Sequence, residues 1–247
     1  MRQNKTQTLK QKIGKAVQNY LPFSPRVTGI LRFEFAVARQ RWANRWFPWR
    51  RVKIAKLRKM RGISLNVGTG GRGKESWINV DAIGSHRDLY CTHDLRQPLP
   101  LARGSVKRIL AEHVIEHLDF YGDVPRVFAE FHRVLEPGGV VRIVVPDVPR
   151  FLEAYRRGGL EGWRELGFKD GIPSDMDTPI ELVNHVFHQK GEHQFGWDFP
   201  AMESALWKAG FKKVVKQKYR ESLDAVLAID QPNHEPYSLY VEAIKER

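Results

Sequence analysis

Residues 106–147, VKRILAEHVIEHLDFYGDVPRVFAEFHRVLEPGGVVRIVVPD, decide the fold of this 247-residue chain. The stretch opens with an apolar run, residues 106–111, that has the length of a buried strand. From Asp123 to Leu135 apolar residues recur at spacings of three and four, which predicts an amphipathic helix. Pro137-Gly-Gly139 ends that helix, and residues 140–145 form a second apolar run of strand length. This alternation of strands and helices predicts an α/β domain with a mainly parallel sheet.

The same alternation extends upstream, with one short connection. Residues 63–67 read as a strand, residues 68–73 as a glycine-rich loop, and residues 77–80 as a strand that ends at Asp81. Only residues 70–76 separate the early glycines from the second strand, too few for an ordinary helix. We therefore predict a shortened first crossover, built as a loop. This disfavours nicotinamide and flavin cofactors, whose pyrophosphate needs a helix N-terminus.

The C-terminal part predicts a different arrangement. Residues 200–209 have the pattern of a helix that stops at Gly210. Residues 211–218 and 237–244 then read as two strands with a long link between them. Such a closing pair is expected to be antiparallel.

The charge is concentrated in the first quarter of the chain, and we place a domain boundary there. Residues 1–62 hold 17 of the 41 Lys and Arg and one of the 28 acids, for a net charge of +16, whereas residues 63–247 carry −3. Residues 1–26 are expected to be loosely ordered, and residues 27–46 to form a helix with one apolar face. That face consists of Leu31, Phe35, Ala38, Trp42 and Trp46. An anionic membrane surface, a nucleic acid, or packing on the domain or on a second copy are three uses for this extension.

Composition restricts the cellular setting. Cys91 is the single cysteine, which excludes an intrachain disulfide and a cysteine-based zinc site. No apolar run reaches the roughly 18 residues that span a bilayer. We expect a cytoplasmic protein, with residues 1–62 able to attach it to the inner membrane face.

Two acids follow predicted strands in positions that suit a nucleoside. Asp81 ends the second strand, where dinucleotide-binding folds use an acid to accept hydrogen bonds from ribose hydroxyls. Asp94 and Leu95 lie thirteen residues further on. There the carboxylate can accept an adenine amino proton while the leucine packs on the ring. Each acid alone is more often an ordinary turn residue. Their combination with the glycine loop is what indicates a nucleoside site.

From Leu65 to about Ile244 the chain resembles class I S-adenosylmethionine-dependent methyltransferases. The resemblance rests on the order of motifs: His-Val-Ile-Glu-His-Leu at residues 113–118, then Arg-Val-Leu-Glu-Pro-Gly-Gly at residues 133–139, then a strand that leads to Asp147. It implies a Rossmann-like fold with a seven-stranded, mostly parallel sheet whose last strand is antiparallel. It also implies an enzyme that uses S-adenosylmethionine and a domain that covers residues 63–247, behind the basic helical extension of residues 1–62.

The resemblance also assigns roles to particular residues. The residues that it implies for cofactor binding are Asn66, Gly68, Gly70, Gly71, Asp81, Asp94, Leu95 and Glu112. Asn66 departs from the family, which usually has an acid at this position to hold the amino group of the cofactor. An asparagine can offer only its amide oxygen.

Three histidines are candidates for a general base: His113, His185 and His193. A histidine near its ordinary pKa suits the removal of a proton from an acceptor hydroxyl. His185, His188 and His193 also have a spacing that metal ligands can use. Phenylalanines interleave them, however, in a region that caps the substrate in similar proteins, and we expect no metal site.

The leading hypothesis is methyl transfer to a small-molecule or glycan acceptor, with a hydroxyl as the methylated group. Proteins with this resemblance often act in surface-polysaccharide biosynthesis. One alternative is a degenerate methyltransferase fold that serves as a membrane-associated or scaffold protein, motivated by Asn66 and the missing crossover helix. The other is an RNA-binding or RNA-modifying protein that uses the basic extension. The oligomeric state is open.

Overall fold

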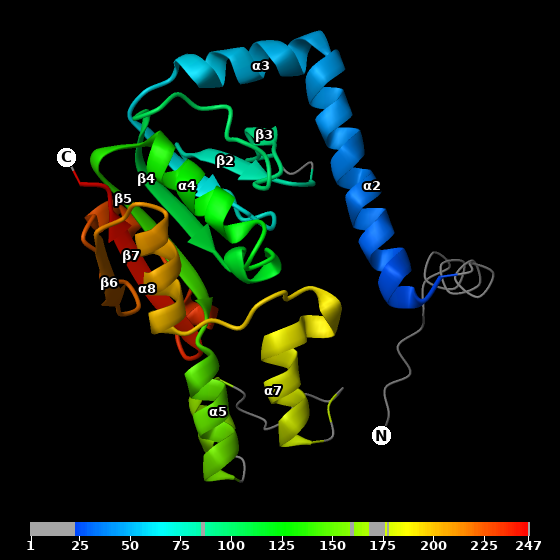
Figure 1. Ribbon diagram of the computed structural model, residues 1–247, viewed down its shortest axis with the longest axis vertical. Helices are drawn as coiled ribbons and strands as arrows, with labels where there is room; N and C mark the ends of the chain where they lie inside the picture. The colour runs from blue at the N-terminus through cyan, green and yellow to red at the C-terminus, as the bar shows by residue number, and fades with distance from the viewer. Residues whose placement is uncertain (1–22, 85–86, 159–160, 168–175, 177, 247) are drawn as a thin grey trace.

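The computed structural model describes residues 23–84, 87–158, 161–167, 176 and 178–246 (Figure 1). The expectation for residues 1–22 lies outside the described residues. Seven strands form one sheet in the order β3-β2-β1-β4-β5-β7-β6. Their bounds are β1 (Ile63–Val67), β2 (Ile78–Asp81), β3 (Cys91–Thr92), β4 (Val106–Glu112), β5 (Leu135–Pro146), β6 (Lys213–Gln217) and β7 (Ser238–Ile244). Strands β1 to β5 pair in parallel, and β7 is antiparallel to both β5 and β6, as predicted.

The strand-helix-strand unit forms as predicted, except at one junction. Helix α4 (Val124–Val134) buries the predicted apolar face. Strand β5 already begins at Leu135, which pairs with Val106, and the next pair joins Arg108 to Val140. The proline and glycines that we expected to separate helix from strand instead form a bulge at the start of β5. The helix therefore passes into the strand without a separate loop.

The two faces of the sheet are covered differently. Helices α4 and α8 (Phe199–Lys208) lie on one face (Figure 1) and bury the large core cluster that includes Phe131 and Leu206. The first crossover, residues 68–77, contains no helix, which confirms the predicted loop. Leu227, from the long link between β6 and β7, covers Leu110 and Val140 on the other face. The C-terminal link thus occupies space that a crossover helix would fill.

Helices α5 and α7 lie beyond the carboxyl ends of the strands (Figure 1), and α6 packs on α5. Their bounds are α5 (Val148–Arg157), α6 (Glu161–Glu165) and α7 (Pro179–His188), and they share a small core of their own around Trp163 and Leu182. Helix α7 starts at a capping box between Thr178 and Glu181, which fixes where the helix begins. We call α5, α6, α7 and the segment that follows α7, up to Gln194, the cap, because they cover the carboxyl edge of the parallel strands.

The N-terminal helices α2 (Pro25–Trp46) and α3 (Pro48–Lys59) meet at a corner that stands away from the sheet (Figure 1). The predicted helix is confirmed, but its apolar stripe faces outward: Phe35 is 77%, Trp42 58% and Trp46 60% exposed. Polar contacts hold α2 to the domain instead, including an ion pair between Arg41 and Asp94. Packing of this stripe on the domain is therefore not its use. None of the described helices is both long and apolar enough to traverse a bilayer.

Candidate active site

A cavity of about 420 Å³ opens at the carboxyl ends of β1, β4 and β5. Parallel α/β sheets bind ligands at this edge, because the loops that follow adjacent strands converge there. Its volume lies within the range of roughly 300–1,000 Å³ that is typical of ligand pockets. The described residues that line it are Asn66, Gly68, Thr69, Gly70, Arg72, Lys74, Glu112, His113, Glu116, His117, Pro146, Phe151, His185, Val186, Gln189, His193, Gln231, His234 and Tyr237.

The glycine loop after β1 forms the floor of the cavity. Gly68 has a φ of 64°, and a side chain there would meet Val114 at 2.3 Å, so neither the backbone conformation nor the space admits another residue. Gly70 also has a positive φ, but a Cβ at this position would point into open space. The loop therefore presents bare backbone to the cavity, as a ligand that approaches closely requires.

Polar side chains hold this loop from behind. The amide nitrogen of Asn66 donates to Asn79 Oδ1 at 2.9 Å, and the same oxygen accepts from the backbone of Lys74. This contact leaves the amide oxygen as the atom that Asn66 can offer to a ligand. Asp81 accepts a hydrogen bond from the backbone nitrogen of Gly70 at 2.8 Å. Asp81 thus supports the loop and is not among the lining residues.

Glu112, at the end of β4, is fixed by the C-terminal link. Its carboxylate accepts from the backbone nitrogen of Gln231 and from Nδ1 of His234, both at 3.0 Å. Burial raises the pKa of Glu112, but these two hydrogen bonds outweigh it and hold the pKa below its usual value. The cavity therefore has an ionised carboxylate on the wall at the end of β4.

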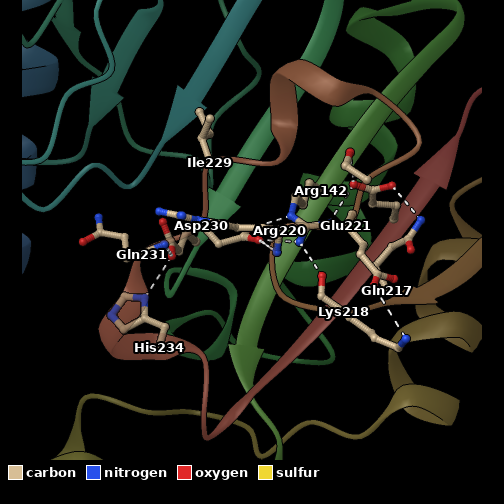
Figure 2. Close-up of polar contacts among 12 residues, drawn as sticks. Arg142, Gln217, Lys218, Arg220, Glu221, Ile229, Asp230, Gln231 and His234 are labelled. Atoms are coloured by element: carbon tan, nitrogen blue, oxygen red, sulfur yellow. Dashed lines mark hydrogen bonds and ion pairs between the residues drawn. The ribbon is translucent and has the colours of Figure 1, made fainter.

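A buried arginine anchors the segment that carries Gln231 and His234 (Figure 2). Arg142, in the middle of β5, is fully buried and binds Asp230 through two hydrogen bonds of 2.6 and 2.7 Å. Its remaining donors bind Glu242 and the carbonyls of Lys218 and Glu221. All its donor nitrogens are engaged, so the link is held firmly one residue before it enters the cavity wall.

His113 lines the cavity, and each of its two ring nitrogens contacts a polar side chain. Nε2 is 2.9 Å from Ser238 Oγ, and Nδ1 is 3.1 Å from a carboxylate oxygen of Glu116. Its φ of 52° is unusual for a residue other than glycine. Backbone strain of this kind persists where the surroundings demand a particular side-chain direction. Here it turns the imidazole between the carboxylate and the serine.

The cap completes the cavity from above. Gln194 donates its backbone N–H to the carbonyl of Glu116 at 2.8 Å, which brings the cap to the 3₁₀ turn Ile115–His117. The imidazole of His193 is buried and its Nδ1 contacts the carbonyl of Val186 at 2.7 Å. Burial lowers the pKa of His193, so this histidine is neutral near pH 7.

Most of the predicted site residues gather in this one cavity. It is lined by all three candidate bases and, from the cofactor set, by Asn66, Gly68, Gly70 and Glu112. Gly71 and Asp81 lie in or behind the glycine loop without lining the cavity. Asp94 and Leu95 are outside it, and the Asp94 carboxylate is paired with Arg96 and Arg41 under α2.

Sequence reasoning missed the residues that the C-terminal link supplies, above all His234 and Tyr237. The ring of His234 lies 4.0 Å from that of His113, although 121 positions separate them in the chain. No local pattern marks this link as functional. The one available signal was Arg142, an arginine in an otherwise apolar strand that requires acidic partners from elsewhere in the chain.

Comparisons with known proteins agree with this arrangement. Residues 80–143 match the family model described as a methyltransferase domain. No curated protein matches the chain. Among solved structures, a Thermotoga maritima S-adenosylmethionine-dependent methyltransferase, described as a possible histamine N-methyltransferase, is similar at 17% identity and a TM-score of 0.46. That similarity covers 89% of this chain and 96% of the other.

Two further similar structures are much longer than this chain. The CurJ carbon methyltransferase is 14% identical with a TM-score of 0.42, over 78% of this chain and 51% of its own. The phosphoethanolamine N-methyltransferase 2 of Haemonchus contortus, solved with S-adenosyl-L-methionine, is 13% identical with a TM-score of 0.40, over 79% and 52%. The chain spans about half the length of these two proteins, and likeness at this level says nothing of the acceptor.

The matched segment runs from the end of β2 through β4 and α4 into β5, and it supplies the cavity wall formed by Glu112, His113, Glu116 and His117. The sheet order is that of a Rossmann-like fold, and within it residues 80–143 match a methyltransferase domain. S-adenosylmethionine is the cofactor that the sequence resemblance implies, and the open glycine loop and the cavity volume fit it. Asn66, Gly68, Gly70 and Glu112 are the predicted cofactor residues that are in place to hold it.

Proposed function

We propose that this protein transfers a methyl group to a hydroxyl of a small molecule or glycan, with His113 as the general base. The observation that carries the proposal is the position of His113, which lines the cavity between Glu116 and Ser238. When bound, S-adenosylmethionine supplies an activated methyl group, so the protein has mainly to orient the acceptor. A hydroxyl must also lose its proton, and the Glu116 carboxylate stabilises the imidazolium that forms when His113 accepts it.

The cavity also favours His113 over the other two candidates. His193 uses Nδ1 on a backbone carbonyl and is buried, with a pKa that burial lowers. His185 lines the cavity from α7, on the cap. His113 follows β4 directly, at the sheet edge where the glycine loop begins and where the cofactor is expected.

Calorimetric titration of S-adenosylmethionine into the intact chain tests the cofactor part of the proposal. We expect micromolar binding that Gly70→Ala weakens, because the added methyl group enters the cavity. Gly138→Ala is the matched control: Gly138 has a positive φ and open space too, but lies at the start of β5, remote from the cavity. Asp81→Ala is expected to weaken binding through the loop that Asp81 supports. Equal affinities in all four proteins would contradict the assigned site.

Transfer is tested with labelled S-adenosylmethionine and glycan or lipid-linked glycan fractions. An ether formed on a hydroxyl keeps its label under mild alkali, whereas a methyl ester loses it. We expect alkali-stable label that His113→Asn abolishes while cofactor binding persists. Label that mild alkali removes would refute a hydroxyl acceptor.

We further propose that α2 and α3 place the enzyme on an anionic membrane surface, so that its acceptor is membrane-associated. The support is the outward stripe of exposed aromatic residues, which Trp49 on α3 continues at 66% exposure. Arg32, Arg39 and Arg45 are exposed and lie three or four positions from stripe residues, so they flank it. Glu34, the one acid of residues 1–62, is paired with Arg96. Aromatic rings with flanking cations suit the headgroup region of an anionic bilayer.

A further inference from the structure

Three potential metal ligands converge where the cap meets the 3₁₀ turn after β4. They are Glu116 and His117 from the turn and His193 from the cap. One ligand atom from each residue lies within 4.8 Å of the others. A single ion holds ligand atoms at about 2.0–2.2 Å. Ligand atoms of one such ion lie about 3.0–3.4 Å apart, so the three side chains would have to move inward by up to about 1 Å each to share one centre.

Both histidines present a free lone pair. His117 Nδ1 contacts the carbonyl of Glu192 at 3.2 Å, and His193 Nδ1 contacts the carbonyl of Val186 at 2.7 Å. A carbonyl can only accept, so each Nδ1 carries the hydrogen and each Nε2 keeps its lone pair. Metal-binding histidines are held in this way, with the second nitrogen donating to a carbonyl that fixes the ring and its tautomer.

The third residue is a buried carboxylate with one close polar partner among the described side chains, His113. Glu116 is 1% exposed, and neither of its carboxylate oxygens accepts a hydrogen bond from the described residues. His113 Nδ1 lies 3.1 Å from one oxygen, but this contact lacks hydrogen-bond alignment. A buried carboxylate without donors is costly unless a cation compensates it. Two imidazole lone pairs beside it add further acceptors and no donor.

We propose that Glu116, His117 and His193 bind one divalent transition-metal ion beside the methyl-transfer site. Two imidazoles and one carboxylate suit zinc, manganese or cobalt better than magnesium or calcium, which prefer oxygen ligands. Three protein ligands leave coordination positions open towards the cavity, as in catalytic rather than structural sites. The site differs from the set His185, His188 and His193 that the sequence suggests, because it takes two of its ligands from the turn after β4.

The position of the ion gives it a role that rests on the proposed function. The ion would share the Glu116 carboxylate with His113, next to the proposed base. An acceptor hydroxyl bound at an open position would have a lower pKa and a fixed orientation, so that His113 could take its proton more easily. Binding of the ion itself depends on none of this and is measured without cofactor or acceptor.

The test is titration of zinc chloride or manganese chloride into the chelator-treated, full-length chain, followed by calorimetry and by thermal unfolding. We expect one ion per chain and an upward shift in Tm, since the ion binds the folded state. Cobalt gives a second readout through its visible absorption bands. Magnesium chloride should bind more weakly than either transition metal.

Variants assign the site. Glu116→Gln and His193→Gln should each weaken ion binding by at least about tenfold. His188→Gln is the matched control, because His188 is an exposed histidine on the same cap and lies outside the cluster. Glu116→Gln also removes a buried charge that accepts no aligned hydrogen bond, so its metal-free form should unfold at a higher temperature than the wild type, and ions should no longer raise that temperature. The unfolding temperature of Glu116→Gln, with and without ions, therefore tests the metal site even if His193→Gln folds poorly.

Two results would overturn the proposal: a wild-type chain that neither binds the ions nor gains thermal stability from them, or ion binding that survives Glu116→Gln and disappears in His188→Gln. Either result leaves the cofactor titration unaffected. Loss of cofactor binding with intact ion binding would instead count against the proposed function alone.

Discussion

At the scale of single residues, buried charge decides what the site can do. Arg142 has no exposure and satisfies its donors with two carboxylates and two carbonyls. Asp230 and Glu242, its partners, are equally buried. Such a network contributes little net stability when complete, but removal of one member leaves charges without partners. Its function here is positional, because Asp230 precedes the two residues that hold Glu112.

Arg142→Met tests that function. We expect it to lower the free energy of unfolding by about 3–5 kcal/mol, since Asp230 and Glu242 would keep their charges without the guanidinium. Urea denaturation measures the loss, and S-adenosylmethionine affinity should fall as well because Gln231 and His234 lose their anchor. Arg142→Lys keeps the charge but cannot make the paired hydrogen bonds of the guanidinium. Its free energy of unfolding should lie between those of the wild type and of Arg142→Met. An unfolding free energy close to that of the wild type would show that the network is dispensable.

At the scale of elements, α2 is turned opposite to an ordinary surface helix. Arg41 and Asn44 face the domain beside the buried Val37: Arg41 pairs with Asp94, and Asn44 donates to the carbonyl of Thr92 at 2.7 Å. Its apolar stripe faces away, and the ring of Trp42 lies beside those of Trp46 and Phe47 at the corner with α3. A helix that exposes its apolar face needs a partner that supplies an apolar phase.

The outward orientation of the stripe predicts binding to anionic lipid vesicles. The full-length chain should float with phosphatidylcholine vesicles that contain phosphatidylglycerol and not with phosphatidylcholine alone, and added salt should weaken the binding. A variant with Trp42→Gln, Trp46→Gln and Trp49→Gln should stay in solution, whereas Trp207→Gln, which alters an exposed tryptophan of α8, should float. Self-association or binding to RNA that the triple variant loses, without vesicle binding by the wild type, would instead identify a second copy or a nucleic acid as the partner.

At the scale of the whole molecule, an ion-pair network fastens the basic helices α2 and α3 to the α/β fold. Asp94 is buried beneath α2 and accepts from Arg96 and Arg41, and Arg96 reaches on to Glu34. Burial raises the pKa of Asp94, but the contacts with the arginines outweigh it and leave the pKa below its usual value. The extension and the domain are therefore coupled through a carboxylate that must stay ionised.

This coupling predicts a dependence on pH. A carboxyl whose folded pKa is depressed stabilises the fold fully above its unfolded pKa of about 3.9 and loses that effect as the pH falls through the folded value. We expect Asp94→Asn to lower the free energy of unfolding by about 1–3 kcal/mol at pH 7. In urea denaturation the difference from the wild type should shrink near pH 3. Glu203→Gln, which alters an exposed acid on α8, should show no such change. A difference that is independent of pH would refute the assignment.

The sequence by itself determined the fold and much of the cavity. The periodicity of residues 106–147 predicted β4, α4 and β5, and the short spacing after Gly70 predicted the looped first crossover. These features depend on local spacing, since strands and helices impose periods of two and 3.6 residues on any chain that buries one face. Because parallel strands end at one edge, the sequence also predicts that the glycine loop and His113 lie close together.

Only the tertiary structure decided which residues face one another across long separations. The register of β7 against β5 brings Ser238 opposite Pro146, and the link before β7 brings His234 to Glu112. The hydrogen bond between Gln194 and Glu116 sets His193 beside the turn, and Arg41 captures Asp94 beneath α2. No spacing rule predicts such contacts, because they depend on how separate elements pack. The sequence therefore determines the class of this protein, while its tertiary packing determines which groups share the cavity and which face of α2 remains exposed.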